Sequence, residues 1–252
     1  MAAVVKKRLR VFAGPNGSGK STITNIVVDY AHLGTYVNAD EIKVILSRDK
    51  FLDFTSYGIH LNEEKFKSEL LSSTLSTKID DIRCTLSNLK FEDDKLILKE
   101  RYEIEDYFVS FITAFIWNEL LDYSKKFTIE TVMSHTSKLD FMMKAKEKGF
   151  KVYLYFVALA DPELNIHRVK TRVAQGGHPV AEEKITQRYY RTMSNLYNAL
   201  KIADSAFLFD NSAGEPNLFA VKNHDQLDVL SEYVPKWFET YFIDKAEAKE
   251  QR

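Results

Sequence analysis

A glycine-rich segment near the start of the chain carries the residue types that grip nucleotide phosphates. It reads Gly14-Pro15-Asn16-Gly17-Ser18-Gly19-Lys20-Ser21, with Thr22 next, and matches the Walker A spacing G-x-x-x-x-G-K-S. Such glycines let backbone N–H groups turn toward an anion, and the N-terminus of a following helix adds positive potential. Lys20 would contact the β- and γ-phosphates of ATP, and the Ser21 hydroxyl would bind Mg²⁺. The segment therefore predicts an ATP and Mg²⁺ site.

Two acidic residues stand at the ends of predicted strands, where ligands of α/β proteins bind. Asp40 follows the apolar strand 35–38, and Glu130 follows Phe127-Thr128-Ile129. Phosphoryl transfer to a hydroxyl needs a carboxylate that orients or deprotonates it, so we assign Asp40 as general base. The alternative is that Asp40 caps a helix from Glu41. Glu130 would contact Mg²⁺ or the acceptor hydroxyl, or would merely face water.

Two further carboxylates compete for the metal role. Asp210 follows an apolar strand, as Glu130 does. Asp161 competes less well, because a helix cap before Pro162 explains it.

Arginines on two successive helices could cover the transferred phosphate. Arg168 and Arg172 are four residues apart and share a helical face, and Arg188 and Arg191 lie on the next helix. Between them Gln175-Gly176-Gly177-His178-Pro179 forms a natural hinge. This order predicts a lid that places cations over the developing charge. The alternative is a pair of solvated helix faces.

Short apolar strands alternate with amphipathic helices along the chain. This alternation predicts an α/β fold with a mainly parallel sheet between helices. The predicted strands are 9–13, 35–38, 127–131, 152–159, 206–210 and 218–221, and the predicted helices include 21–29, 104–123, 182–200 and about 230–242. The charged residues from Asp244 to Arg252 are predicted to fray.

Residues 50–104 do not fit a minimal α/β kinase. They are polar and mostly helical in pattern, with no clear strand before Leu96–Leu98. We predict a mainly helical insertion at about 50–104 within a single P-loop kinase-like domain that spans residues 1–252.

The composition narrows the classes of partner. The formal charge of the 252-residue chain is −1, which argues against a dedicated nucleic-acid binder. Cys84 is the only cysteine, which excludes an intrachain disulfide. The start shows no signal peptide, and no apolar stretch is long enough to span a membrane. We expect a cytoplasmic protein that binds neither nucleic acid nor membrane.

Taken together, the motifs resemble the zeta-toxin family of P-loop kinases. The matching pieces occur in the family's order: Gly14–Thr22, Asn38–Ile42, Glu130-Thr131, Gln175–His178, Arg188–Arg191 and Asp210–Ser212. The resemblance implies a P-loop NTPase of kinase-like three-layer architecture. It further implies a kinase for a sugar hydroxyl, in the known toxins that of UDP-N-acetylglucosamine, and an antitoxin protein as partner; a related plant-pathogen effector phosphorylates NAD.

The family's site residues carry over by motif. The resemblance implies that Lys20 grips phosphate, that Asp40 is the catalytic base and that Glu130 is the strand-end acid. It makes Arg172 the first lid arginine and leaves Arg188 or Arg191 as the second. Two departures fall near the acceptor and the lid. After Glu130-Thr131 the family often has a hydroxyl residue followed by a Gly-Arg pair, whereas this chain has Val132–His135. After Gly-Gly-His the family usually has proline at the third position, whereas here Pro179 follows directly and Ala181 takes the third position.

Other classes of P-loop protein remain as alternatives. ABC-type ATPases have the same loop sequence. These proteins also need a Leu-Ser-Gly-Gly signature and a strand that ends in Asp-Glu, and the chain has neither. A nucleotide-binding partner protein without kinase activity is the other alternative.

Overall fold

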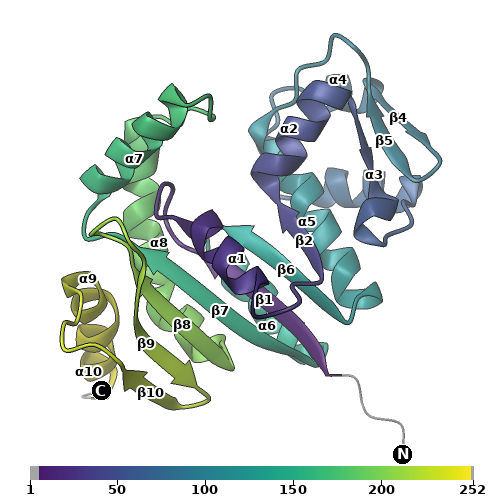
Figure 1. The fold of residues 1–252 in the computed structure, drawn as a ribbon. Helices are drawn as coiled ribbons and strands as arrows, with labels where there is room; N and C mark the ends of the chain where they lie inside the picture. The colour runs from purple at the N-terminus through teal and green to yellow at the C-terminus, as the bar shows by residue number, and fades with distance from the viewer. Residues whose placement is uncertain (1–5, 251–252) are drawn as a thin grey trace, which may run out of the picture. The chain divides into compact units, whose positions relative to one another are not determined.

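The computed structural model describes residues 6–250. Residues 1–5 and 251–252 lie outside the described residues. They include the start of the chain, where no signal peptide is expected, and the end of the charged tail. The chain divides into two compact units (Figure 1). Unit 1 comprises Met1–Leu33 and Glu130–Arg252, and unit 2 comprises Gly34–Ile129. The single domain over residues 1–252 stays a prediction.

Unit 1 is built on a sheet whose neighbouring strands follow the order β10-β9-β8-β7-β1. β1 pairs with β7 and β7 with β8 in parallel, whereas β9 and β10 run antiparallel. Parallel strands covered on both faces read as continuous apolar runs, and the last five residues of β7 are all buried. The strands are β1 (Lys7–Ala13), β7 (Phe150–Ala158), β8 (Ser205–Asp210), β9 (Asn217–Asn223) and β10 (Gln226–Val229).

Helices cover both faces of this sheet (Figure 1). On one face, α1 (Lys20–Val28) packs Ile23 and Val27 against Phe12 and Tyr155 of the strands. On the other lie α6 (Ser137–Glu147) and α8 (Glu182–Ile202), and α7 (Pro162–Ala174) packs against α8. The predicted α/β class, with a mainly parallel sheet between helices, is confirmed.

The C-terminal segment differs from the prediction. A helix was expected from about Leu230, but it begins only after Pro235, since a residue that precedes proline is disfavoured in helical backbone. It comprises α9 (Lys236–Phe238), the π-helical turn η3 (Glu239–Ile243) and α10 (Asp244–Glu250). The described part of the tail predicted to fray, Asp244–Glu250, is therefore helical, and Lys249 lies over the Tyr197 ring of α8 at 4.4 Å.

Unit 2 contains β2 (Thr35–Asn38) beside β6 (Lys126–Thr131), and the boundary between the units falls within β6. Phe66 lies at the centre of its core, with the rings of Phe54, Phe111 and Phe115 within 6.3 Å. The helices are α2 (Ala39–Asp49), α3 (Glu63–Ser72), α4 (Ile82–Ser87) and α5 (Asp106–Tyr123), with short turns η1 (Phe54–Tyr57) and η2 (Ser76–Lys78).

The insertion carries strands that the sequence did not reveal. β3 (Phe51–Asp53), β5 (Lys95–Leu98) and β4 (Leu89–Glu92) form a small sheet in that order, of which only β5 was predicted.

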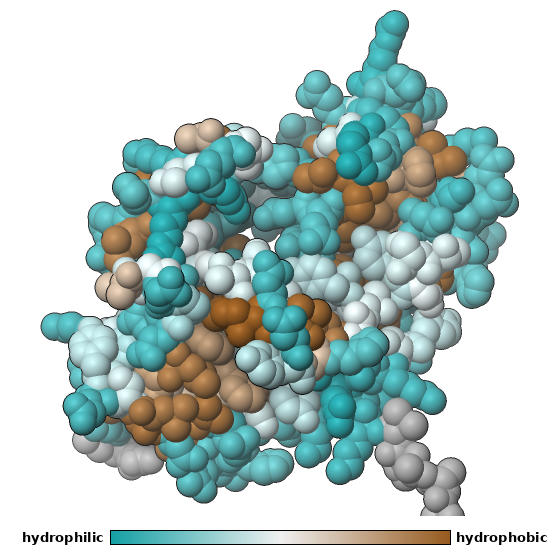
Figure 2. Space-filling model, in the orientation of Figure 1, coloured by the Kyte–Doolittle hydropathy of each residue, from teal (hydrophilic) through white to brown (hydrophobic). Residues whose placement is uncertain are grey.

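Between residues 6 and 250 no helix is long and apolar enough to cross a membrane. Figure 2 shows hydrophobic residues over the part of unit 1 where β8, β9 and α1 lie. Phe207 and Phe209 of β8 and Val221 of β9 are half-buried.

Candidate nucleotide site

The glycines of the Walker A loop occupy positions that a side chain could not. Gly14, Gly17 and Gly19 all have positive φ, and Gly19 precedes the first residue of α1. A Cβ on Gly14 would lie 2.0 Å from the Val157 carbonyl oxygen, and one on Gly19 would lie 2.3 Å from Asn211 Nδ2. The loop is thus pressed against β7 and the turn after β8. Only glycine allows this backbone path, which is of the kind that can turn N–H groups toward a bound anion.

Lys20 lies across the loop rather than in solvent. It is 8% exposed, and its Nζ donates hydrogen bonds to the carbonyl oxygens of Gly14 and Pro15, each at 3.1 Å. Glu130 Oε1 lies 4.0 Å from the same nitrogen. The structure therefore brings two of the predicted residues together in unit 1, with a fixed cation at the loop.

The loop also fits the phosphate and metal groups that its sequence implies. The Ser18 hydroxyl is fully buried and has no hydrogen-bond partner among the described residues. Buried hydroxyls are normally satisfied, so a polar ligand suits this position. Ser21, in the first turn of α1, is exposed and presents a hydroxyl at the helix N-terminus. Together with the glycine cradle and Lys20, these residues have the chemistry to hold a nucleotide phosphate and a Mg²⁺ ion.

Two buried asparagines fix the loop from either side. Asn165 of α7 donates from Nδ2 to the Asn16 carbonyl oxygen at 2.6 Å, and Asn211 donates to that of Ser18 at 2.9 Å. Sequence reasoning missed both roles. Asn211 stood within a family-like motif, Asp210–Ser212, but Asn165 had no signal beyond a helical pattern.

The four arginines of the predicted lid fall into two groups. Arg168 donates at 2.5 Å to the carbonyl oxygen of Asn211, which itself binds the loop, and Arg188 donates to Asn16 Oδ1 in the loop at 3.4 Å. Arg172 is exposed and donates to the His178 carbonyl oxygen at 3.1 Å, within its own hinge. Arg191 is exposed. Between the two candidates for the second lid arginine, only Arg188 contacts the loop.

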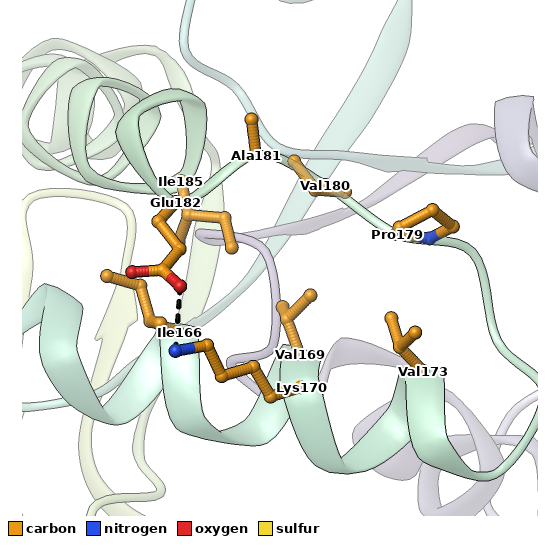
Figure 3. A pocket seen from close by; sticks show the side chains of 9 residues that line it. All are labelled: Ile166, Val169, Lys170, Val173, Pro179, Val180, Ala181, Glu182 and Ile185. Carbon is orange, nitrogen blue, oxygen red and sulfur yellow. Dashed lines mark ion pairs between the residues drawn. The ribbon is translucent and has the colours of Figure 1, made fainter.

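A pocket of about 420 Å³ lies between α7, the hinge and α8 (Figure 3). Aliphatic side chains line most of it, and Lys170 pairs with Glu182 at 2.7 Å. Val169 borders both this pocket and the loop, because a Cβ on Gly17 would lie 3.1 Å from its Cγ2. The hinge therefore encloses space beside the phosphate loop.

The carboxylates that competed for the metal role have structural partners. Asp161 caps α7, since its side chain accepts from the Leu164 N–H at 2.9 Å. Asp210 accepts from the Ser212 N–H at 2.7 Å and from Trp237 Nε1 at 3.3 Å. Both carboxylates are thus used to hold a turn or a helix start.

Asp40 belongs to unit 2, in the first turn of α2. The helix is capped by Asn38, whose Oδ1 accepts from the Asp40 N–H at 2.9 Å, so the alternative role of Asp40 as cap is wrong. The Asp40 side chain is exposed and lines a pocket of about 320 Å³ with Glu41, Val44, Ile45 and Arg48. Its carboxylate is therefore open to a ligand, and its role as base stays a prediction.

One titratable group in unit 2 has a strongly shifted pKa near this helix. Burial, together with the charge of Glu41, raises the pKa of Tyr57 to about 12. Tyr57 therefore keeps its proton at neutral pH and can only donate or accept hydrogen bonds there as a phenol.

The chain is similar to a known protein family over much of its length. The family profile described as Zeta toxin matches residues 65–212, more than half of the chain. The chain belongs to the zeta toxin family. The matched region contains Glu130, the hinge and the four arginines, and it begins after the Walker A loop and Asp40.

Individual relatives are distant or partial. An uncharacterized protein of Haemophilus influenzae is 40% identical over 63 residues, which are 25% of this chain and 45% of the relative. The crystal structure of the AvrRxo1-ORF1:-ORF2 complex has a TM-score of 0.50 at 16% identity, over 90% of this chain and 62% of the matched chain. The chain thus spans less than two thirds of both relatives.

A structure from the PezAT chromosomal toxin–antitoxin system of Streptococcus pneumoniae has a TM-score of 0.42 at 14% identity, over 83% of this chain and 69% of that chain. At such identities these likenesses bear on the fold alone. The likeness to the AvrRxo1 complex covers 90% of this chain.

Proposed function

We propose that the protein is an ATP- and Mg²⁺-dependent kinase that transfers a phosphoryl group to a hydroxyl of a nucleotide sugar such as UDP-N-acetylglucosamine. The observation that carries the proposal is the pre-formed phosphate cradle. Gly14 and Gly19 lie so close to the Val157 carbonyl oxygen and the Asn211 side-chain amide that no Cβ would fit. Lys20 is held between the loop carbonyl oxygens and Glu130. Membership of the zeta toxin family supports a kinase over the other P-loop classes.

Each residue has a role that follows from its chemistry. The loop N–H groups, Lys20 and Ser21 would hold the nucleotide phosphates and Mg²⁺, which when bound supply the phosphoryl group and offset its charge. Asp40 would accept the proton of the acceptor hydroxyl. Glu130 would contact the metal shell or the acceptor.

The arginines would stabilise charge that develops on the transferred group. Arg188 already lies at the loop, whereas Arg172 is bound to the His178 carbonyl oxygen and would have to leave it. The Gly176-Gly177 turn of the hinge is where such a movement would occur, since Gly176 has a φ of 91°.

The experiment that tests this function uses defined acceptors. The full chain is incubated with ATP, Mg²⁺ and either UDP-N-acetylglucosamine or NAD, and products are identified by mass spectrometry. A phosphorylated nucleotide sugar, lost in the Asp40→Asn variant, supports the proposal. ADP formed without any phosphorylated acceptor would instead indicate a P-loop ATPase, and no ADP at all would indicate a nucleotide-binding partner protein.

We further propose that an antitoxin protein restrains the activity, because the family is one of toxins. Expression of the wild-type chain alone is then expected to lyse bacterial cells, and the Asp40→Asn variant should spare them. Equal growth with both chains would argue against a cell-wall target.

A further inference from the structure

One edge of α8 carries a row of polar side chains that reach two distant parts of unit 1. Arg188, Thr192 and Asn195 are spaced by four and three residues, so they share one side of the helix. Arg188 contacts Asn16 in the Walker A loop. Thr192 Oγ1 donates to the Val132 carbonyl oxygen at 2.8 Å, and Asn195 Nδ2 donates to that of Met133 at 2.9 Å.

The two members of this row nearer the C-terminus of α8 are buried. Thr192 is fully buried and Asn195 is 8% exposed. A buried hydroxyl or amide costs free energy unless it is hydrogen-bonded, and a threonine inside a helix usually bonds to the carbonyl four residues earlier. Here both side chains leave their own helix and bind the backbone of another segment.

The segment they hold, Val132–Thr136, is the post-β6 segment. Met133 is 1% exposed and has a φ of 58°, which is the left-handed region that non-glycine residues seldom occupy. Such backbone persists only where the surroundings over-determine it. Three hydrogen bonds hold this backbone: those from Thr192 and Asn195 to its carbonyl oxygens, and one from the Met133 N–H to Thr131 Oγ1 at 3.0 Å.

The post-β6 segment begins two residues after Glu130. Glu130 is the carboxylate that lies 4.0 Å from Lys20. We propose that Thr192 and Asn195 are positioning residues, which lock the post-β6 segment in its left-handed turn and so hold Glu130 beside Lys20. α8 then joins the Walker A loop, through Arg188, to the backbone behind the acid. The effect on turnover rests on the proposed function, whereas the effect on backbone order does not.

Amide hydrogen exchange tests the structural part without nucleotide. In the full chain, Thr192→Val and Asn195→Leu should each speed exchange of peptides over residues 131–136 by about ten-fold, with peptides of β7 unchanged. Thr192→Ser keeps the hydroxyl and should restore the wild-type rate. Asn198→Ala, an exposed change on the same helix, is the matched control and should have no effect.

Exchange of 131–136 at the wild-type rate in Thr192→Val and Asn195→Leu would overturn the proposal. The proposal would also be overturned if exchange became faster throughout unit 1, and did so in Thr192→Ser as well, because that pattern indicates a general loss of stability.

Steady-state kinetics test the link to Glu130. Thr192→Val should lower kcat by about ten-fold and leave KM for ATP within about two-fold, because the P-loop is intact and only the acid is displaced. Thr192→Ser should recover kcat. A disordered segment with unchanged kcat would refute the link to Glu130. A wild-type chain that transfers no phosphate would overturn the proposed function instead, and the exchange result would still decide whether Thr192 and Asn195 hold the segment.

Discussion

Lys20 and Glu130 face each other at 4.0 Å, and their side chains are only 9% and 11% exposed. The lysine begins α1, directly after the loop that follows β1, and the glutamate lies at the end of β6, so the pair links α1 to the end of β6. Nζ also donates to two loop carbonyl oxygens, which fix it before any ligand arrives. A cation held in this way needs little reorganisation to bind phosphate.

Lys20→Ala should lower nucleotide turnover roughly 100-fold or more, because it removes the charged donor at the phosphates. Turnover is measured as ADP release under saturating acceptor. Lys125→Ala, at an exposed lysine of unit 2, is the matched control and should keep normal turnover. Near-normal turnover in Lys20→Ala would refute the assignment of the loop.

Gly14→Ala should destabilise unit 1 by about 1–3 kcal/mol and weaken ATP binding, because its Cβ would lie 2.0 Å from the Val157 carbonyl oxygen. Gly149→Ala is the control. Gly149 also has a positive φ, of 82°, but a Cβ there meets no atom within 4 Å, so it should cost about 1 kcal/mol and leave ATP binding intact. Urea unfolding and ATP titration of both variants measure this. Equal effects on ATP affinity would show that the close approach to β7 does not shape the loop.

Asp204 should make stability depend on pH. Burial acts to raise the pKa of this carboxyl, but hydrogen bonds from the Val152 N–H at 2.8 Å and from Lys146 outweigh it and lower the pKa. A lowered folded-state pKa adds stability above the unfolded value of about 3.9, and this is lost as pH falls through the folded value. Asp204→Asn should therefore cost about 1–2 kcal/mol at pH 7, and this difference should shrink as the pH falls below about 3.9.

The measurement is urea unfolding of wild type and Asp204→Asn between neutral and acid pH. Asp140→Asn, at an exposed position on α6, should leave the curve unchanged. A difference between wild type and Asp204→Asn that stays constant into strong acid would contradict the assignment.

The strands and long helices of unit 1 could be predicted because their patterns are long and regular. Predicted strand 152–159 corresponds to β7, and predicted helix 182–200 to α8. The hairpin β4-β5 could not, because its turn is Asp93-Asp94, both with positive φ, where Asn-Gly or Asp-Gly would be the usual signal. The helicity of Asp244–Glu250 depends on packing against α8, which a local charge pattern does not contain.

In the candidate site, too, the features set by local sequence could be predicted, and those set by contacts between distant residues could not. The Walker A spacing identifies its own glycines, since their conformational need is local. The clamps from Asn165 and Asn211 join residues far apart in the chain, and an asparagine on a helix carries no mark of such a contact. Likewise Arg188 and Arg191 look equivalent in sequence, and only the direction of α8 brings Arg188 to the loop.

Asp40→Asn should keep ATP affinity within about two-fold and lower phosphoryl transfer roughly 100-fold or more, as expected when a general base is lost. The carboxylate is exposed and does not cap its helix, so the change should not affect folding. Asp29→Asn, another exposed acid, serves as control. Transfer at the wild-type rate in Asp40→Asn would exclude it as the base.

We propose above all that the chain transfers a phosphoryl group from ATP to a small molecule. The most direct measurement is incubation with isotopically labelled ATP, Mg²⁺ and a metabolite extract, followed by a mass-spectrometric search for labelled species heavier by one phosphate. We expect one principal labelled product, a nucleotide sugar, that is absent with Lys20→Ala and Asp40→Asn. Label found only in inorganic phosphate, or left wholly in ATP, would contradict it.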